Sequence, residues 1–188
     1  KDAMSDVGIS NVFYELFKNE FVYCVLGKGE EYYQFINHRW KEIDEFTLLK
    51  YMDEHLRKIY SDKMDYHEKK ARAADDSERE KQLKYTEKFN KIYVSLGSVP
   101  KKKNILKQLK QKFYKSKDEF YDLLDSNSYL IGFSNGVYDL ETSSFRKGRP
   151  SDLITLSTGY PYKSAEESQS DEDLEIRRDI ANFYHSIF

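Results

Sequence analysis

Residues 21–43 constrain the fold more than any other segment, because short runs of aromatic and β-branched residues alternate there with turn residues. FVYCVL is followed by GKG, EYYQFI is followed by NHR, and WKEI ends the segment. Such runs, separated by Gly and Asn turns, are typical of a small antiparallel sheet. We therefore expect a sheet of this kind near the start of the chain.

Helical spacing of apolar residues flanks this segment. Residues 9–18 (ISNVFYELFK) show it, and a longer helix is expected after Asp44, which can cap the first turn. Residues 61–77 lack an apolar stripe, which indicates either an exposed extension of that helix or an exposed connection. The buried stripe of the longer helix is expected to contain Leu48, Leu49, Met52, Leu56, Ile59 and Tyr60.

Further helices are expected in the middle of the chain. Ser77 and Glu80 can form a capping box, and GSVP at 97–100 would end that helix and start the next. Ser116 and Glu119 can form another capping box, which predicts a short helix through Leu124. The helix after Ser77 has apolar residues at Tyr85, Phe89, Ile92 and Leu96.

From Tyr129 the pattern changes to short strands and turns, with long irregular stretches. Residues 164–175 are acidic and polar, which favours a linker, and residues 174–188 resume helical spacing. The predicted fold class is α+β, helix-rich, with a small antiparallel sheet and a C-terminal strand-and-turn region. We divide the chain into one domain at 1–163 and an acidic linker with a helix at 164–188.

Composition and missing motifs exclude several classes of protein. The net charge of the 188 residues is only −2, so any nucleic-acid footprint must come from local clustering of basic residues. Cys24 is the only cysteine, so no internal disulfide or thiolate zinc cluster is expected, which fits a reducing compartment. No apolar run approaches the roughly 18 residues of a membrane span. The chain starts with Lys1, and we expect it to be part of a longer protein.

Motifs for catalysis and metal binding are also missing from the sequence. It contains no G-x-x-x-x-G-K-[ST] phosphate loop and no G-x-S-x-G elbow. The four histidines are scattered at positions 38, 55, 67 and 185, without the spacing of paired metal ligands. We therefore predict no catalytic residue, no metal ligand and no cofactor within this chain.

Residues 101–117 (KKKNILKQLKQKFYKSK) are the most basic segment, with eight lysines and no acidic residue. At about 100° per residue, four of the lysines and Tyr114 share one face of a helix, roughly opposite Leu106, Leu109 and Phe113. A phosphate backbone would relieve repulsion between lysines on that face and release counterions. The alternative is a solvated face that acidic residues elsewhere neutralise. The candidate nucleic-acid-binding residues are Lys103, Lys107, Lys110, Tyr114 and Lys117.

The aromatic segment EYYQFINHRWKEI supplies a second candidate site. Tyr33 and Trp40, beside Arg39 and Lys41, could form a stacking platform for single-stranded bases. Strand alternation places Tyr33 and Phe35 on one face, so packing in the core is the competing interpretation.

A third segment spans IGFSNGVYDLETSSFRKGRPSDLITLSTGYPY. Asn135-Gly136 suits a turn that needs a positive φ, and Asp139 can accept hydrogen bonds from nearby backbone N–H groups. Pro150 and Asp152 would shape the next turn, so turn architecture alone can explain these residues. The basic residues that could extend a nucleic-acid-binding surface are Arg146, Lys147 and Arg149.

The third segment resembles the helicase-associated domain of poxvirus-type and phage-type primase-helicases. The pattern is Asn-Gly-Val-x-Asp-Leu-x-Thr, a basic stretch, then Pro-x-Asp-x-x-Thr and a Tyr. The hairpin with Trp40 also resembles that family's Trp-bearing hairpin, so the resemblance spans roughly residues 9–163. One departure is Ser143, where such domains often carry Gly. The motif residues here are Asn135, Gly136, Val137, Asp139, Leu140, Thr142, Pro150, Asp152, Thr155, and Tyr160 or Tyr162.

The resemblance implies a non-catalytic module between a primase and a superfamily 3 ATPase motor in a large DNA virus. It further implies that the parent protein uses ATP and Mg²⁺, assembles as a homo-hexamer on single-stranded or forked DNA, and works in a cytoplasmic viral replication factory. The helix at 174–188 would then lead into the oligomerising collar. The partners of this chain would be DNA and the helicase and primase domains of the same protein.

Two other functions stay open. One is a protein-interaction module that recruits replication partners without touching nucleic acid. The other is an enzyme fragment with its own hydrolase or nuclease site, which would need carboxylates converging in a pocket, and the sequence shows no such constellation.

Overall fold

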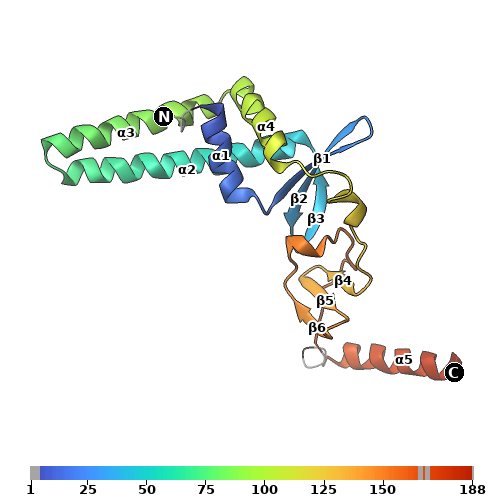
Figure 1. The fold of residues 1–188 in the computed structure, drawn as a ribbon. Coiled ribbons are helices and arrows are strands. Elements are labelled where there is room, and N and C mark those ends of the chain that lie inside the picture. Colours follow the sequence, from blue (N-terminus) through green and yellow to red (C-terminus); the bar gives the residue numbers. More distant parts are fainter. Residues whose placement is uncertain (1–4, 165–166, 168–169, 188) are drawn as a thin grey trace.

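The computed structural model describes residues 5–164, 167 and 170–187, which form an α+β fold with two three-stranded antiparallel sheets (Figure 1). The first sheet contains β1 (Phe21–Leu26), β2 (Gly29–Ile36) and β3 (Arg39–Ile43) in chain order. Gly27 has a φ of 62° in the first turn, and Asn37 and His38 have φ values of 51° and 67° in the second. The predicted sheet is therefore confirmed.

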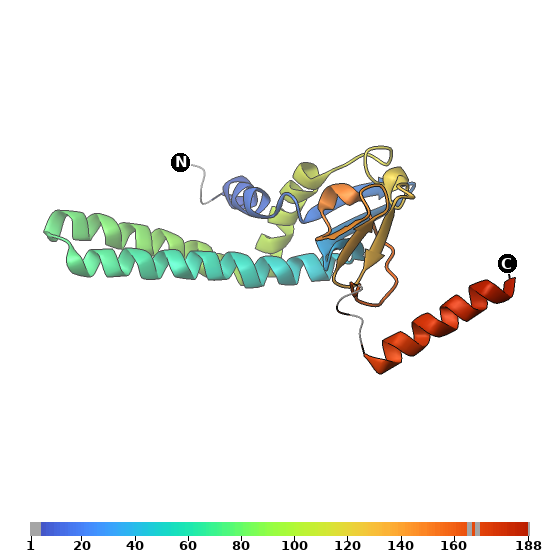
Figure 2. The ribbon, with the colours of Figure 1, turned by 90° about the horizontal axis from the view of Figure 1, so that it is seen from below.

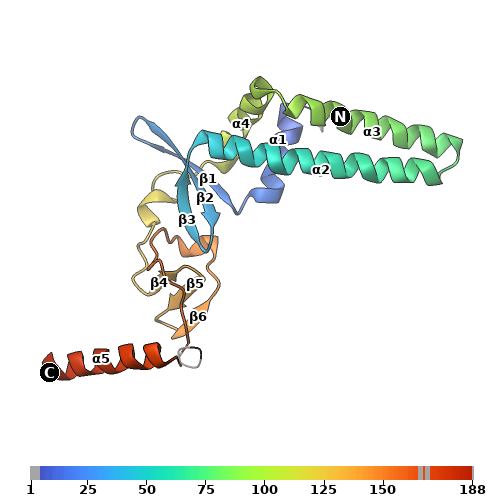
Figure 3. The ribbon, with the colours of Figure 1, turned by 180° about the vertical axis from the view of Figure 1, so that it is seen from behind.

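Helices α1 (Asp6–Phe17) and α4 (Val99–Phe113) lie beside the base of a long antiparallel pair formed by α2 (Glu45–Ala73) and α3 (Asp76–Leu96) (Figures 1 and 3). Asp44 caps α2, as predicted, because its carboxylate accepts a hydrogen bond from the Thr47 backbone N–H at 2.7 Å. Residues 61–73 continue α2, so the exposed-extension interpretation holds for them.

The predicted capping box of Ser77 and Glu80 is wrong. Helix α3 begins two residues earlier than that box would start it, and the side chain of its N-cap residue, Asp75, accepts a hydrogen bond from the Glu78 backbone N–H at 3.0 Å. Asp and Ser are both good N-cap residues, so the sequence offered two possible starts for one helix, two residues apart. A short break separates α2 from α3, and the backbone of Ala74 is extended there.

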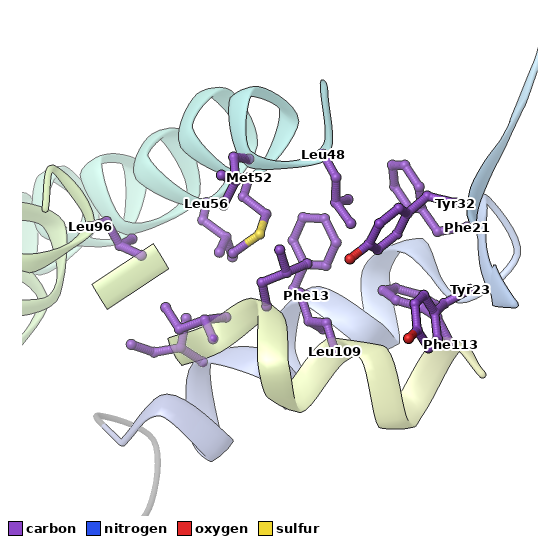
Figure 4. Packing of buried hydrophobic residues seen from close by; sticks show 14 of the residues in the cluster. Phe13, Phe21, Tyr23, Tyr32, Leu48, Met52, Leu56, Leu96, Leu109 and Phe113 are labelled. Atoms are coloured by element: carbon purple, nitrogen blue, oxygen red, sulfur yellow. The ribbon is translucent and has the colours of Figure 1, made fainter. Parts of the chain in front are cut away.

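The first sheet separates two clusters of buried residues, because successive side chains of a strand point to opposite faces. Phe21, Tyr23 and Tyr32 pack against the helices on one face (Figure 4). Val22, Cys24, Tyr33 and Trp40 pack on the other face with Phe120. The helical cluster contains the predicted α2 stripe except Ile59, which is half-buried.

The second sheet contains β4 (Leu130–Phe133), β5 (Gly136–Asp139) and β6 (Ser144–Arg146), which confirms the strand-and-turn region. Two short 3-10 helices flank it, η1 (Tyr121–Leu123) and η2 (Pro150–Asp152). The short helix predicted for 116–124 is wrong. Ser116 does donate to Glu119 through its backbone N–H and its hydroxyl, at 3.1 and 2.8 Å, but only a turn and η1 follow.

Helix α5 (Asp171–Ile187) projects away from the two sheets and from the α2–α3 pair (Figures 1 and 2). None of its residues is buried. No helix within the described residues is long and apolar enough to cross a membrane.

Candidate nucleic-acid interface

Helix α4 carries the basic segment, and its apolar side is buried as predicted. Ile105, Leu106, Leu109 and Phe113 lie in the helical cluster, which fixes which face of the helix points to solvent. Lys103 and Lys107 are exposed on that outer face, and neither forms an ion pair with any residue that the structure describes.

The other two lysines of the predicted face are held by acidic side chains, so the prediction of one continuous lysine row is wrong. Lys110 pairs with Glu30 of β2, which lies 80 residues away in the sequence. Lys117 pairs with Asp122 at 2.7 Å. The helix ends at Phe113, so Tyr114 and Lys117 do not continue its face, although Tyr114 is 52% exposed. Two free cations remain of the predicted four.

Lys110 lies over two tyrosine rings, with its Nζ 5.5 Å from the Tyr23 centroid and 5.7 Å from the Tyr32 centroid. Burial alone would lower the pKa of Lys110, but hydrogen bonds with Glu30 and Tyr32 outweigh it and the pKa is raised. The hydrogen bond from Lys110 correspondingly lowers the pKa of Glu30. This lysine therefore fastens α4 to the first sheet.

Tyr33 and Trp40 are packed in the core rather than displayed for base stacking. They are 5% and 4% exposed, and Phe120 contacts both rings edge to face at centroid distances of 5.2 and 5.0 Å. Both residues line an open cleft of about 430 Å³, but the rings are too deeply buried to present a face to a base. The core-packing interpretation therefore holds for both.

Trp40 also joins the first sheet to the segment around η2. Its indole Nε1–H donates to the Pro150 carbonyl at 2.9 Å, and its backbone N–H donates to the Ile154 carbonyl at 2.8 Å. This contact joins the Trp-bearing hairpin to the Pro-x-Asp part of the motif, 110 residues later in the chain.

Arg146 and Asp152 form a two-pronged ion pair in the same region. The two guanidinium nitrogens of Arg146 donate to the Asp152 carboxylate at 2.8 and 2.9 Å, and the backbone N–H of Arg149 adds a third bond at 2.7 Å. The hydrogen bonds to Asp152 raise the pKa of Arg146. Arg146 therefore fixes the loop, and its charge is already neutralised, which removes it from the set of free cations.

Asn135 and Gly136 have structural roles, but the predicted positive φ is wrong for both. The Asn135 side chain donates to the Tyr162 carbonyl at 3.0 Å and accepts from the Tyr162 N–H at 2.8 Å. Glycine is required at 136 because a Cβ there would lie 2.5 Å from the Arg146 carbonyl oxygen and 2.6 Å from the Phe145 ring.

Among the remaining motif residues, Asp139 shapes a turn and Thr155 makes a long-range contact. Asp139 accepts hydrogen bonds from the backbone N–H groups of Glu141 and Thr142 at 3.1 and 3.2 Å, as predicted. Thr155 donates its N–H to Asp125 at 2.7 Å, and Asp125 also binds the Thr155 hydroxyl. Leu140 is 47% exposed. Sequence reasoning missed Asp125, whose position in the turn-rich run DSNS was the available signal.

No group of three or more His, Cys, Asp or Glu side chains within the described ranges is arranged to hold a metal ion. What the site offers chemically is hydrogen bonding and positive charge at its surface.

Residues 10–175 match the family described as D5 N terminal like. The chain is 34% identical over 172 residues to a protein of Acanthamoeba polyphaga mimivirus named "Putative helicase", covering 90% of this chain and 17% of that relative. It is 37% identical over 100 residues to a protein of Invertebrate iridescent virus 3 with the same kind of name, covering 53% of this chain and 10% of that relative. The chain therefore belongs to the D5 N terminal like family, and the resemblance seen in the motif is confirmed.

The chain thus spans 17% or less of the length of these two relatives. A similar protein of Frog virus 3 (isolate Goorha), also named "Putative helicase", is 39% identical over 54 residues, which are 29% of this chain and 5% of that relative.

Proposed function

We propose that this chain is a non-catalytic module of a replicative DNA helicase from a large DNA virus, where it connects a primase to an ATPase motor and contacts DNA. One observation carries the proposal: 90% of the chain aligns with only 17% of a mimivirus protein named as a helicase. That ratio is expected of one domain within a much larger replication protein.

The contacts around Trp40 support the connecting role. A connector must hold its parts in a fixed relation, and Trp40 bridges the first sheet to Pro150 and Ile154 through two hydrogen bonds. Asp125 adds a third tie, because it accepts the backbone N–H groups of Thr155 and Leu156 at 2.7 and 3.2 Å. In the parent protein, ATP and Mg²⁺ would bind to the motor, and the motor would form the hexameric ring on DNA in the viral replication factory of the host cytoplasm.

The outer face of α4 is the proposed DNA contact. Lys103 and Lys107 are four residues apart, so both lie on one side of the helix, and neither is neutralised by a described acidic side chain. Two such cations can bind two phosphates of a single strand. Loss of two contacts should lower the slope of log K against log salt by about 1.4.

Fluorescence anisotropy of a labelled oligothymidylate across a salt series tests this contact. The Lys103→Glu/Lys107→Glu variant should bind with the shallower slope and about tenfold more weakly at low salt. The matched control is Lys69→Glu/Arg79→Glu, which makes the same change in net charge at exposed positions on the far end of the α2–α3 pair. Equal binding by wild type and the Lys103/Lys107 variant would remove α4 from the proposal.

A second candidate function, docking to protein, is favoured by α5. Its apolar side chains are about half exposed or more, and no described residue covers them. An amphipathic helix of this kind needs a partner for its apolar stripe, and the proposed occupant is a segment of the longer parent protein. Ile180→Asp/Phe183→Asp should leave DNA binding unchanged but abolish assembly of the full-length protein, measured by sedimentation. The stripe contains Ile176, Ile180, Phe183, Tyr184 and Ile187.

A further inference from the structure

Two acid-free segments that lie far apart in the sequence touch each other at the edge of the first sheet. Residues 37–41 are NHRWK and residues 145–151 are FRKGRPS, and both contain cations but no carboxylate. A Cβ on Gly148 would lie 2.5 Å from the His38 carbonyl oxygen and 2.7 Å from the His38 Cβ, so the backbone at 148 is pressed against the β2–β3 turn. Only glycine allows the loop to approach the turn this closely.

The contact brings the backbones of three residues with unpaired cationic side chains close together. Arg39 directly follows the touching residue His38, and Lys147 and Arg149 flank Gly148. Consecutive Cα atoms are about 3.8 Å apart, so the three Cα atoms are gathered around one contact point. None of these three side chains forms an ion pair with the residues that the structure describes, and Lys147 and Arg149 are exposed.

The carboxylates of Asp139 and Asp152 do not cancel this charge. Asp152 is the first acidic residue after the loop, and its side chain is only 7% exposed while it binds both Arg146 and the Arg149 backbone. Asp139 is 16% exposed, lies 3.8 Å from Arg146, and accepts two backbone hydrogen bonds. Arg146 therefore neutralises the carboxylates of Asp139 and Asp152. The side chains of Lys147 and Arg149 are left free to bind an anion.

The loop and the turn are also held in place. Trp40 donates to the Pro150 carbonyl directly after Arg149, and η2 lies beside β3. Asn37 and His38 both occupy left-handed backbone positions, which Gly favours in such hairpin turns. One of these two positions carries the imidazole of His38, which directly precedes Arg39 in the chain.

We propose that His38, Arg39, Lys147 and Arg149 form a composite phosphate-binding site, here called the junction site, which takes the backbone of a nucleic-acid strand. An exposed group of cations suits a polyanion, since each neutralised phosphate releases counterions and no enclosing pocket is needed. The junction site deepens the proposed DNA contact and depends on it. It lies on loops at the edge of the first sheet, whereas Lys103 and Lys107 lie on α4.

The test is anisotropy of a labelled oligothymidylate with Lys147→Glu/Arg149→Glu in the full 188-residue chain. We expect binding about tenfold weaker at low salt and a salt slope reduced by about 1.4, because two phosphate contacts are lost. The Lys69→Glu/Arg79→Glu control also replaces one lysine and one arginine, and it should bind like wild type. Lys147→Gln/Arg149→Gln should show a smaller loss of the same sign, which keeps the test valid if charge reversal disturbs folding.

Single substitutions test whether the two segments act as one site. Arg39→Gln and Arg149→Gln should each weaken binding, and their combined effect should be smaller than the product of the two, because they share phosphates. Fully multiplicative effects would contradict a shared site.

The outcomes separate this inference from the proposed function. If wild type does not bind the oligonucleotide, both are wrong. If only the Lys103/Lys107 variant loses binding, DNA contact stands and the junction site is wrong. If inorganic pyrophosphate at micromolar concentration displaces the oligonucleotide in wild type but not in Lys147→Glu/Arg149→Glu, the ligand is a small phosphate compound, and the nucleic-acid assignment is overturned.

Discussion

Ser143 occupies a backbone conformation that suits glycine. Its φ is 50°, in the left-handed region. The left-handed conformation costs a residue with a Cβ about 1–2 kcal/mol, whereas Gly loses about 0.5–1 kcal/mol more chain entropy on folding. Ser143→Gly should therefore raise the free energy of unfolding by up to about 1 kcal/mol, measured by urea titration.

Ser144 provides the control for this prediction. It begins β6 with ordinary extended backbone, so Ser144→Gly should lower the free energy of unfolding by about 0.5–1 kcal/mol. Equal effects at both positions would show that the backbone angle at 143 carries no strain.

Cys24 is the single thiol. It lies in β1 and is fully buried on the face of the first sheet that packs with Phe120. Burial raises the pKa of the thiol to about 11, so little thiolate exists at pH 8. We expect Cys24 in the folded protein to react with a thiol reagent at least about 100-fold more slowly than in urea. Rapid stoichiometric labelling of the native protein at pH 8 would contradict the burial of this strand.

At the scale of elements, the Lys110–Glu30 pair ties α4 to β2 and predicts a dependence of stability on pH. The lowered pKa of Glu30 means that the pair stabilises the fold above the ordinary Glu value of 4.5 and that this contribution is lost as the pH falls through the folded-state pKa. The Glu30 side chain is half exposed, so the contribution is at most about 1 kcal/mol. Glu30→Gln should therefore be less stable than wild type at pH 7, and the difference should be smaller at pH 3.

Chemical denaturation at the two pH values measures this difference. Glu87→Gln, an exposed position on α3, should show the same small offset from wild type at both. A stability gap between wild type and Glu30→Gln that stays constant down to pH 3 would mean that the pair is not linked to protonation.

Local patterns in the sequence predicted most of the elements but little of their charge pairing. The turns around Gly27 and Asn37 and the stripe from Leu48 to Tyr60 depend on neighbours in the sequence, so spacing was enough to find them. The lysine row on α4 failed because Glu30, 80 residues away, neutralises Lys110. The contact of Gly148 with His38 depends on tertiary packing, and no local pattern could predict it.

On the scale of the whole molecule, burial is uneven along the α2–α3 pair. The part of α2 near the sheet contains most of its buried residues, which are Leu48, Leu49, Met52, Leu56 and Tyr60. Farther out, Ala71 is the one buried residue of α2 and Gln82 the one on the facing part of α3, within the part of the chain that the structure describes. Apolar burial is the main source of stability, so the outer part should open more easily.

A small polar cluster holds the outer part of the pair together. His67 Nδ1 and Gln82 Oε1 are 2.5 Å apart, and the Gln82 amide donates to Glu78 at 2.5 Å. The His67 ring also stacks on Phe89 with a centroid distance of 5.4 Å. Buried polar groups stabilise only when their partners are present, so loss of Gln82 would leave His67 without its main hydrogen-bond partner.

Hydrogen exchange of backbone amides tests this gradient. Amides at 62–90 should open with free energies at least about 2 kcal/mol below those at 48–60, because local opening there exposes little apolar surface. Gln82→Ala should lower the opening free energies of the amides at 62–90 by about 1 kcal/mol more and leave those at 48–60 unchanged. Leu83→Ala, at a side chain that is 43% exposed, is the control and should alter neither group. Uniform protection along both helices would mean that the α2–α3 pair opens only when the whole protein unfolds. The pair would then be equally rigid along its whole length.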